Sequence, residues 1–327
     1  MNTRIDISEN YIRSYDSEVM DLMLFDQTSR SNIYWASDDY AHLGEMYSFF
    51  SPITPESITG DNIKVIRPRV LKAKELQSAR SREMAEVFTP SWICNAQNNL
   101  IDEAWFRRKD VFNHENEDHT WTPTKDKIIF PEGRNWKDYV RDTRLEITCG
   151  EGPYLSSRYD TTTGDFIPIS DRIGLLDRKL RVVSENTETS GEFLEWSQEA
   201  YMSLYGYEWQ GDNLLLARES MFYSFIEYYK AKFGKEPLKR SARAIAYIIS
   251  WNLWQMDGLK CILPMSCHEE EVGLDLFGST ERKKCIGCAT NKLRAHNGTY
   301  CLIKDWENKG EDGNQGKTIR FVDLINQ

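Results

Sequence analysis

The sequence predicts a mixed α/β protein built on a doubly wound, mostly parallel sheet. Three apolar segments, near residues 144–147, 204–208 and 251–257, have the composition of short strands. Segments with helical periodicity lie between them, and each predicted strand is followed by glycine or by an acid. Parallel strands need long crossover connections, which are usually helices, so this alternation is typical of a parallel sheet.

The composition allows one large domain or two smaller ones and narrows the functional classes. Of the 327 residues, 40% are hydrophobic, which is enough for a sizeable core. The net charge of −10 argues against a protein that coats nucleic acid through its overall charge, although it permits a local basic patch. Seven cysteines, an odd number, argue against a disulfide framework. The polar N-terminus and the lack of long apolar runs predict a cytoplasmic protein without a membrane partner.

Three regions differ in composition and pattern. Residues 1–84 form a predicted helical N-terminal extension, and residues 85–262 carry most of the strand–helix alternation. Residues 263–327 are rich in cysteine and end in predicted closing strands. We therefore expect an α/β domain flanked by two smaller segments.

The N-terminal extension contains two amphipathic patterns and one basic stretch. Residues 17–25 and 40–50 have the spacing of amphipathic helices. Residues 64–82 carry seven basic residues and a single acid, Glu75. This stretch is interpreted either as a phosphate-contacting patch or as a solvated helix face. The net negative charge of the chain favours the second interpretation.

Residues 85–97, which follow the basic stretch, have the form of a helix start. Thr89 offers a capping hydroxyl, and Pro90 suits the first helical position. Trp92 and Ile93 are then expected to face a core. Two interpretations stay open: an ordinary capped helix, or a helix end that places Thr89 and its neighbouring amides beside a polar ligand.

Residues 145–155 predict a strand, a tight glycine turn and a helix that starts at Pro153. Gly150 and Gly152 let the backbone bend sharply and approach a ligand closely, where a Cβ would collide. Downstream, the sequence predicts a hairpin at residues 162–165 and helices at residues 171–183, 191–203, 213–233 and 238–249.

Polar residues at the ends of the three predicted strands suit a nucleoside ligand. The carboxyl ends of parallel strands meet at one edge of a sheet, where α/β proteins bind ligands. Gly150 and Gly152 follow the first strand, Glu208 ends the second, and Asp257 ends the third. Glu208 is expected to accept the ribose hydroxyls, with Asp177 as a rival, and Asp257 to accept an adenine amino group.

Four segments in this order resemble the motifs of one enzyme family. They are Glu86-Val-Phe-Thr-Pro90, Glu146-Ile-Thr-Cys-Gly-Glu-Gly-Pro-Tyr-Leu155, Tyr205-Gly-Tyr-Glu208 and Asn252-Leu-Trp-Gln-Met-Asp-Gly-Leu259. The first resembles a Phe-x-Thr-Pro motif and the second an Asp-Pro-Ala-Cys-Gly-Thr-Gly-x-Phe-Leu motif. The third resembles a second-strand acid and the fourth an Asn-Ile-x-x-Gly-Asp-x-Leu motif. Together they are similar to the amino-methylating DNA methyltransferases of restriction–modification systems, described as restriction endonuclease subunit M.

The resemblance covers about residues 85–260 and implies a class I methyltransferase-like, Rossmann-like domain that binds S-adenosylmethionine. It implies N6-methylation of adenine in double-stranded DNA, with the target base flipped out of the helix, in a restriction–modification or phage-defence setting. A second restriction–modification subunit is the implied protein partner. The residues that it places around the cofactor are Phe88, Thr89, Pro90, Glu146, Cys149, Gly150, Gly152, Glu208 and Asp257.

The sequence departs from this family in its catalytic motif. The family holds the target amino group with Asn/Asp-Pro-Pro-Tyr/Phe, but no two of the ten prolines here are adjacent. The interval from Gly150 to Glu208 is also far longer than the usual ~20 residues. No catalytic residue is therefore assigned. A partner chain supplies the motif, or the chain is an inactive methyltransferase-fold subunit that binds DNA or a partner, or it is an unrelated nucleotide-binding protein.

A cysteine cluster near the C-terminus has metal-ligand spacing. Cys285 and Cys288 form a Cys-x2-Cys pair, which suits two ligands of a tetrahedral zinc ion. Cys267 and Cys301 are the expected further ligands, with His268 or His296 as substitutes. We favour structural zinc over free thiols, and a purely structural knuckle over a nucleic-acid contact.

Overall fold

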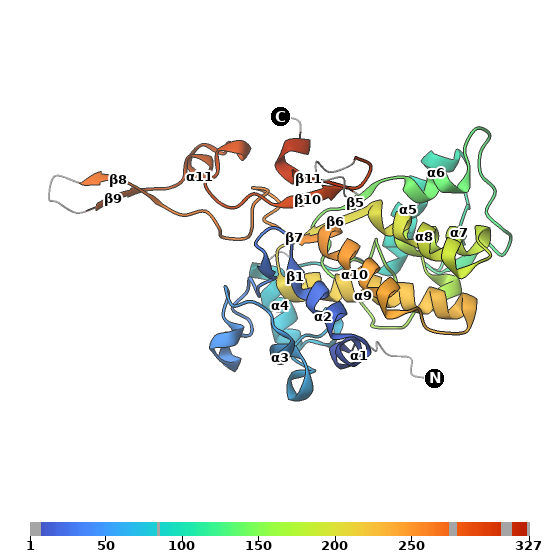
Figure 1. Ribbon diagram of the computed structural model, residues 1–327, viewed down its shortest axis with the longest axis horizontal. Helices are drawn as coiled ribbons and strands as arrows, with labels where there is room; N and C mark the ends of the chain where they lie inside the picture. Colours follow the sequence, from blue (N-terminus) through green and yellow to red (C-terminus); the bar gives the residue numbers. More distant parts are fainter. Residues whose placement is uncertain (1–7, 84–85, 275–279, 309–315, 326–327) are drawn as a thin grey trace.

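The computed structural model describes residues 8–83, 86–274, 280–308 and 316–325, and the fold is mixed α/β (Figure 1). A three-stranded parallel sheet contains β5 (Arg144–Glu146), β6 (Leu204–Glu208) and β7 (Leu253–Gln255), in that order. The register pairs Leu145 with Tyr205 and Tyr207 with Trp254. The three strands expected from the sequence therefore form one sheet.

This sheet separates two hydrophobic clusters because its side chains alternate between two faces. Leu204 and Leu253 belong to the larger cluster, which the helices fill. Tyr207 and Trp254, on the opposite face, belong to a smaller cluster that the C-terminal segment completes.

The helices predicted at residues 171–183, 191–203, 213–233 and 238–249 are present, with shifted ends. Buried Leu176, Leu180 and Val183 form one stripe, and Thr189 caps the helix after it with a capping box. The observed helices are α5 (Ser91–Phe106), α6 (Trp136–Arg141), α7 (Leu175–Asn186), α8 (Ser190–Met202), α9 (Gly211–Phe233) and α10 (Lys239–Asn252). Among the described helices, none has both the length and the apolar character that a bilayer crossing requires.

The second face of the sheet is covered by a hairpin. Strands β10 (Leu302–Asp305) and β11 (Lys317–Arg320) pair antiparallel and lead into a 3-10 turn, η7 (Phe321–Leu324). The Phe321 ring lies 5.2 Å from the ring of Trp254, measured between centroids. A doubly wound sheet, which has helices against both faces, is therefore not confirmed.

The N-terminal segment joins the main core. It contains α1 (Glu9–Tyr15), α2 (Ser17–Leu24), β1 (Phe25–Asp26), β2 (Ser31–Asn32), α3 (Pro55–Ile58) and α4 (Lys74–Glu83). Buried Ile12 and Trp35 belong to the same hydrophobic cluster as Leu180 of α7. The helix predicted for residues 40–50 is wrong, because Gly44, with φ at 129°, separates two short 3-10 turns.

Two further hairpins lie away from the sheet. Strands β3 (Asn113–Glu115) and β4 (Trp121–Pro123) pair beside the 3-10 turn η5 (Ile169–Asp171). Strands β8 (Glu270–Leu274) and β9 (Thr280–Lys283) form an arm that projects from the body, with α11 (Ile286–Thr290) near its base (Figure 1).

Arg218, on α9, is fully buried and ties several elements together through backbone carbonyls. Its Nη1 donates to the carbonyls of Met23 at 2.7 Å and Phe25 at 3.0 Å. Its Nε and Nη2 donate to the carbonyl of Leu253 at 3.0 and 2.7 Å, and Nη2 also donates to Ser250. The guanidinium therefore joins the end of α2 to the start of β7.

Replacing Arg218 with methionine is expected to lower the free energy of unfolding by at least about 3 kcal/mol, because several buried carbonyls lose their donor. Urea denaturation measures this change. The matched control is Arg320→Met, which removes an exposed ion pair with Asp323 and is expected to change the free energy of unfolding far less. Equal losses in the two variants would contradict this role of Arg218.

Candidate functional site

The carboxyl edge of the sheet, defined here as residues 147–155, 208–213 and 256–260, brings the predicted ligand residues of two strands together. The amide of Gly150 donates to Glu208 Oε2 at 2.9 Å. The amide of Met256 donates to the carbonyl oxygen of Glu208 at 2.9 Å, so the residue after β7 is held beside the end of β6. Glu208 therefore sits between the glycine turn and the third strand.

Phe88 reaches the same edge from a distant part of the chain. A Cβ built on Gly150 would lie 3.5 Å from the Phe88 ring, so the ring packs directly on the glycine turn. The guanidinium of Arg69 lies over the Phe88 ring, 5.4 Å from its centroid. The half-buried Thr89 uses its carbonyl to accept from the Thr161 hydroxyl at 3.2 Å.

The two glycines adopt left-handed conformations, with φ at 54° for Gly150 and 72° for Gly152. The sharp turn predicted here is confirmed, but the helix predicted from Pro153 is wrong. The next helix, α7, begins only at Leu175. The edge therefore has no helix N-terminus directly after the glycine turn. Pro90, rather than Thr89, precedes α5, and no side-chain hydroxyl caps that helix.

Glu146 and Cys149 are buried and support the turn from inside. The carboxylate of Glu146 accepts from the amides of Tyr154 at 3.4 Å and Leu155 at 3.1 Å. Burial raises the pKa of Glu146 to about 8, although these amide bonds oppose the rise. Burial also raises the pKa of the Cys149 thiol well above its ordinary value. Glu146 therefore holds the backbone after the turn in place, and the Cys149 thiol is buried beneath it.

The two aspartates considered as ligand residues lie in different places. Asp257 follows β7 by two residues, accepts from the amide of Leu259 at 3.0 Å and pairs with Lys260 at 3.2 Å. Asp177 lies on α7, where it accepts from the amide of Ser157 at 2.8 Å. Asp257 therefore belongs to the carboxyl edge, whereas Asp177 lines a separate cavity.

A buried ionic network lies beside the edge, and sequence reasoning missed it. Arg80 is fully buried and contacts Glu86 at 2.6 Å, Asp212 at 3.0 Å and the side-chain oxygen of Gln210 at 2.6 Å. Lys72 pairs with the same Asp212 at 2.7 Å. The basic stretch 64–82 is therefore neither a free patch nor a wholly solvated face. The only sign of this ionic network in the sequence is the excess of basic residues in that stretch.

This network fills part of the space next to the glycine turn. The backbone amide of Arg69 donates to Glu151 at 2.6 Å, and its guanidinium lies 3.2 Å from Glu86. None of the three cavities of about 690, 600 and 830 Å³ in the described structure is lined by Phe88, Gly150 or Glu208, and the third reaches the carboxyl edge only at Leu259 and Lys260. At Gly150 the carboxyl edge is covered by the side chain of Phe88, with the guanidinium of Arg69 over its ring.

A second candidate site is a cluster of three cysteines and one histidine. The pairing of β8 with β9 brings Cys267, just before the arm, next to Cys285, just after it. Cys288 lies on α11, and His296 follows the 3-10 turn η6 (Leu293–Ala295). The four ligand atoms lie within 4.8 Å of one another, so the cluster can hold a metal ion such as zinc.

The distances in this cluster match a tetrahedral ion. Nδ1 of His296 lies 3.5 Å from Sγ of Cys267 and 3.6 Å from Sγ of both Cys285 and Cys288. The Sγ atoms of Cys267 and Cys285 are 3.5 Å apart. Zinc–ligand bonds of about 2.3 Å to sulfur and 2.0–2.1 Å to nitrogen give S–N edges of about 3.6 Å and S–S edges of about 3.8 Å. The side chains are therefore already arranged around a position for the ion.

The surroundings of the cluster favour a metal-bound thiolate. Burial raises the pKa of Cys285, but amide bonds from Asn297 and Cys288 and the contact with His296 outweigh it and lower this pKa to about 6. A Cβ on Gly287 would lie 2.5 Å from Nδ1 of His296, so glycine at this position makes room for the imidazole. The position of His296 in the cluster therefore depends on the glycine at residue 287.

Cys301, expected as a ligand, lies outside the cluster. Its buried thiol donates to the carbonyl of Gln255 at 3.3 Å, because the pairing of its backbone with Cys261 turns it toward the sheet. His268 is exposed and is also outside the cluster. His296, considered from the sequence only as a substitute, takes the fourth position.

One loop connects the two candidate sites. The amide of Asp257 donates to the carbonyl of Ile262 at 2.8 Å, which closes the turn after β7. Farther along, the amide of Thr299 donates to Ser266 Oγ at 3.1 Å, directly before Cys267. The chain from the carboxyl edge to the metal cluster is therefore short and hydrogen-bonded.

Comparison of the chain with protein-family models, with curated proteins and with solved structures gives no match in any of the three searches. The functional argument therefore depends on the geometry of the two sites.

Zinc content distinguishes His296 from Cys301 as the fourth ligand. We expect one zinc ion per chain after purification, and the same content in Cys301→Ala, because that thiol lies outside the cluster. His296→Ala is expected to lower zinc retention at least tenfold in a chelator competition, because it removes one of four ligands. Elemental analysis by mass spectrometry measures both. Loss of zinc in Cys301→Ala with retention in His296→Ala would contradict the assignment.

Glu146 is expected to make folding stability depend on pH. Its folded pKa of about 8 lies above the ordinary value of 4.5, so the folded state binds more protons between these two pH values. The contribution of Glu146 to stability is then fully present below about pH 4.5 and is lost as pH rises toward about 8. Glu146→Gln removes this contribution, so its unfolding free energy relative to wild type changes by up to about 1.4 kcal/mol per pH unit in this range.

Urea denaturation at several pH values between 5 and 8 measures this effect. The control is Glu132→Gln, which changes an exposed carboxylate. Its unfolding free energy is expected to depend on pH in the same way as that of the wild type. If the unfolding free energy of Glu146→Gln also depends on pH as that of the wild type does, Glu146 is already ionised at pH 5 in the folded protein.

Proposed function

We propose that the chain binds S-adenosylmethionine at the carboxyl edge and acts in the N6-methylation of adenine in DNA, within a restriction–modification or phage-defence system. The observation that carries this proposal is the meeting of Phe88, Gly150 and Glu208 at one place. These residues come from three separate segments that resemble three motifs of the methyltransferase family. A chance resemblance would not require the segments to be neighbours in space.

The strand order also supports the proposal. In the doubly wound order 3-2-1-4-5-6 the second strand lies between the first and the third, and ligands bind outside the carboxyl ends of the strands. Here β6 lies between β5 and β7, and both pairs are parallel. We infer that this sheet is a reduced version of a class I methyltransferase-like sheet, with the C-terminal hairpin replacing helices on one face.

The residues at the edge suit the parts of such a cofactor. Glu208 would accept the ribose hydroxyls and Asp257 the adenine amino group, since carboxylate oxygens retain free acceptor positions after one hydrogen bond. Gly150 and Gly152 would allow close approach of the methionine part. S-adenosylmethionine supplies the methyl group, and this chain's residues bind and orient the cofactor. A second chain would supply the side chains that hold a flipped adenine.

A second candidate function is that of an inactive methyltransferase-fold subunit that binds DNA or a partner chain. The closed network around Arg80, Glu86 and Asp212 favours it, because these side chains occupy space beside the glycine turn. A cofactor would have to displace part of the segment that carries Arg69 and Lys72.

Calorimetric titration of the purified, zinc-loaded protein with S-adenosylmethionine separates the two functions. Saturable binding with a Kd below about 100 µM supports the first, and Asp257→Ala is expected to weaken it at least tenfold by removing one anchor, about 1.4 kcal/mol. The exposed Asp61→Ala is the control and is expected to leave the Kd unchanged. Absence of binding by folded protein would reject the cofactor site and leave the inactive subunit.

A further inference from the structure

Two buried carboxyl groups lie where the helix α1 packs on α9. Glu9 is the first residue of α1 and is 2% exposed, and Glu219 on α9 is 0% exposed. Figure 1 shows α1 at the periphery of the molecule, close to the N-terminus. A buried carboxylate is costly unless cations or several hydrogen-bond donors surround it. The protonation of these two groups therefore affects how firmly α1 is held.

Neither carboxyl group has the partners that an ionised form needs. Both oxygens of Glu219 and Oε2 of Glu9 make no hydrogen bond with any described residue, and neither group forms an ion pair with one. Arg158 is bonded instead to Glu227 at 2.6 Å and lies over the ring of Tyr223, 4.6 Å from its centroid. A buried carboxyl group without donors is most stable when it keeps its proton.

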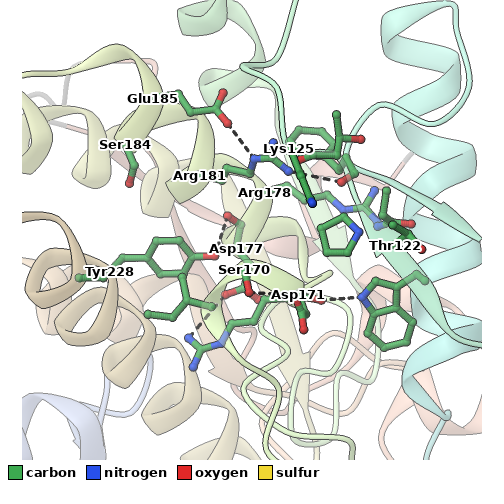
Figure 2. Close-up of a pocket in the computed structure, with 18 of the residues that line it drawn as sticks. Thr122, Lys125, Ser170, Asp171, Asp177, Arg178, Arg181, Ser184, Glu185 and Tyr228 are labelled. Carbon is green, nitrogen blue, oxygen red and sulfur yellow. Dashed lines mark hydrogen bonds and ion pairs between the residues drawn. The ribbon is translucent and has the colours of Figure 1, made fainter.

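Other buried carboxylates in this part of the protein are paired with arginines. Asp177, in the wall of the cavity of about 690 Å³ that Figure 2 shows, pairs with Arg172 at 3.9 Å. Glu227, farther along α9, pairs with two arginines, each at 2.6 Å, and these pairs lower its pKa although it is buried. Glu9 and Glu219 differ from these groups because no described cation pairs with them.

The charge of the pair changes above neutral pH. Burial raises the pKa of Glu9 from its ordinary 4.5 to about 7. Burial and repulsion from Glu9 raise the pKa of Glu219 well above its ordinary value, and Arg158 opposes this rise only in part. Because Glu9 repels Glu219, the second group ionises at a higher pH than the first.

The groups around the pair do not share this behaviour, with one exception. Burial raises the pKa values of Tyr159 and Tyr223, which keeps both phenols neutral, as it does for Tyr11. The exception is Glu151, whose pKa burial raises to about 7 and which accepts from the Tyr159 hydroxyl at 2.6 Å. The other charged groups on the elements that pack with α1 are Arg13, Asp16, Glu56, Arg158, Glu227, Glu236 and Arg243.

We propose that α1 docks on α9 in a pH-dependent manner, held while Glu9 and Glu219 carry protons and released as they ionise. The docked state binds these protons more tightly than the released state. Its extra stability is therefore fully present below about pH 4.5 and is lost as pH rises through about 7. This property is independent of the proposed cofactor site at the carboxyl edge.

Release is expected to be local because α1 has only seven residues and few polar anchors. The hydroxyl of Tyr223 donates to the carbonyl of Ser8 at 2.8 Å, and Arg13 donates to the hydroxyl of Thr59 at 2.6 Å. Buried Ile12 supplies the apolar contact with the core. Release of α1 uncovers Ile12 and the ring of Tyr223 while the sheet and its helices stay folded.

Hydrogen exchange of the full-length, zinc-loaded protein between pH 5.5 and 8, followed by mass spectrometry, tests the proposal. After correction for the intrinsic effect of pH on exchange, protection of the amides in residues 9–15 is expected to fall at least tenfold over this range. The loss of one proton weakens docking by up to about tenfold per pH unit. We also expect α1 to exchange faster than α7 at every pH, because it opens without the core.

Three variants assign the effect. Glu9→Gln cannot ionise and is expected to reduce the fall in protection to less than threefold, and the double variant with Glu219→Gln to remove the rest. The control is Glu236→Gln, which changes an exposed carboxylate that accepts from Tyr11 of α1 at 3.2 Å and is expected to keep the wild-type fall. If the double variant does not fold, Glu9→Gln alone decides the proposal.

Three results would overturn the proposal. They are protection of α1 that does not fall with pH, a wild-type fall in Glu9→Gln, and equal exchange of α1 and α7. A wild-type fall in Glu9→Gln would assign the effect to another group, such as Glu151.

Discussion

Two buried basic side chains that donate to backbone carbonyls hold the sheet in its place among the helices. Arg218 connects α9 with the ends of α2 and α10 and with the start of β7. Lys179, on α7, donates to the carbonyls of Val140 and Asp142 and to Ser203 Oγ, which lie just before β5 and β6. Burial lowers the pKa of Lys179 to about 7. Several oxygens accept hydrogen bonds from each of these buried side chains, and the carboxyl edge depends on the strand positions that result.

Local patterns in the sequence predicted most elements of the fold but not the covering of the sheet. Apolar periodicity identified α7 to α10, because each of them buries at least one face. The pattern at residues 40–50 was misleading, since Gly44 interrupts it and aromatic packing around Trp35 replaces the helix. The alternation of strand and helix predicted parallel pairing. It could not show that the hairpin of β10 and β11 covers the second face, because that contact joins distant segments.

The candidate sites were predictable where neighbouring residues define them. The Cys-x2-Cys spacing identified Cys285 and Cys288, and the glycine turn identified Gly150 and Gly152. The choice between His296 and Cys301 depends on where the arm and the last hairpin direct each side chain, which spacing does not encode. The network of Arg80, Glu86 and Asp212 joins residues up to 132 positions apart, so no sequence pattern indicated it.

The central claim is that a ligand binds where Phe88, Gly150 and Glu208 meet. Hydrogen exchange of the zinc-loaded protein, followed by mass spectrometry with and without saturating S-adenosylmethionine, tests it most directly. The account predicts slower amide exchange in residues 147–155 and 86–90, where the ligand would contact the backbone, and little change in α7 or at the C-terminal end of α9. Unchanged exchange at the carboxyl edge of the folded protein, or protection confined to another region, would contradict the claim.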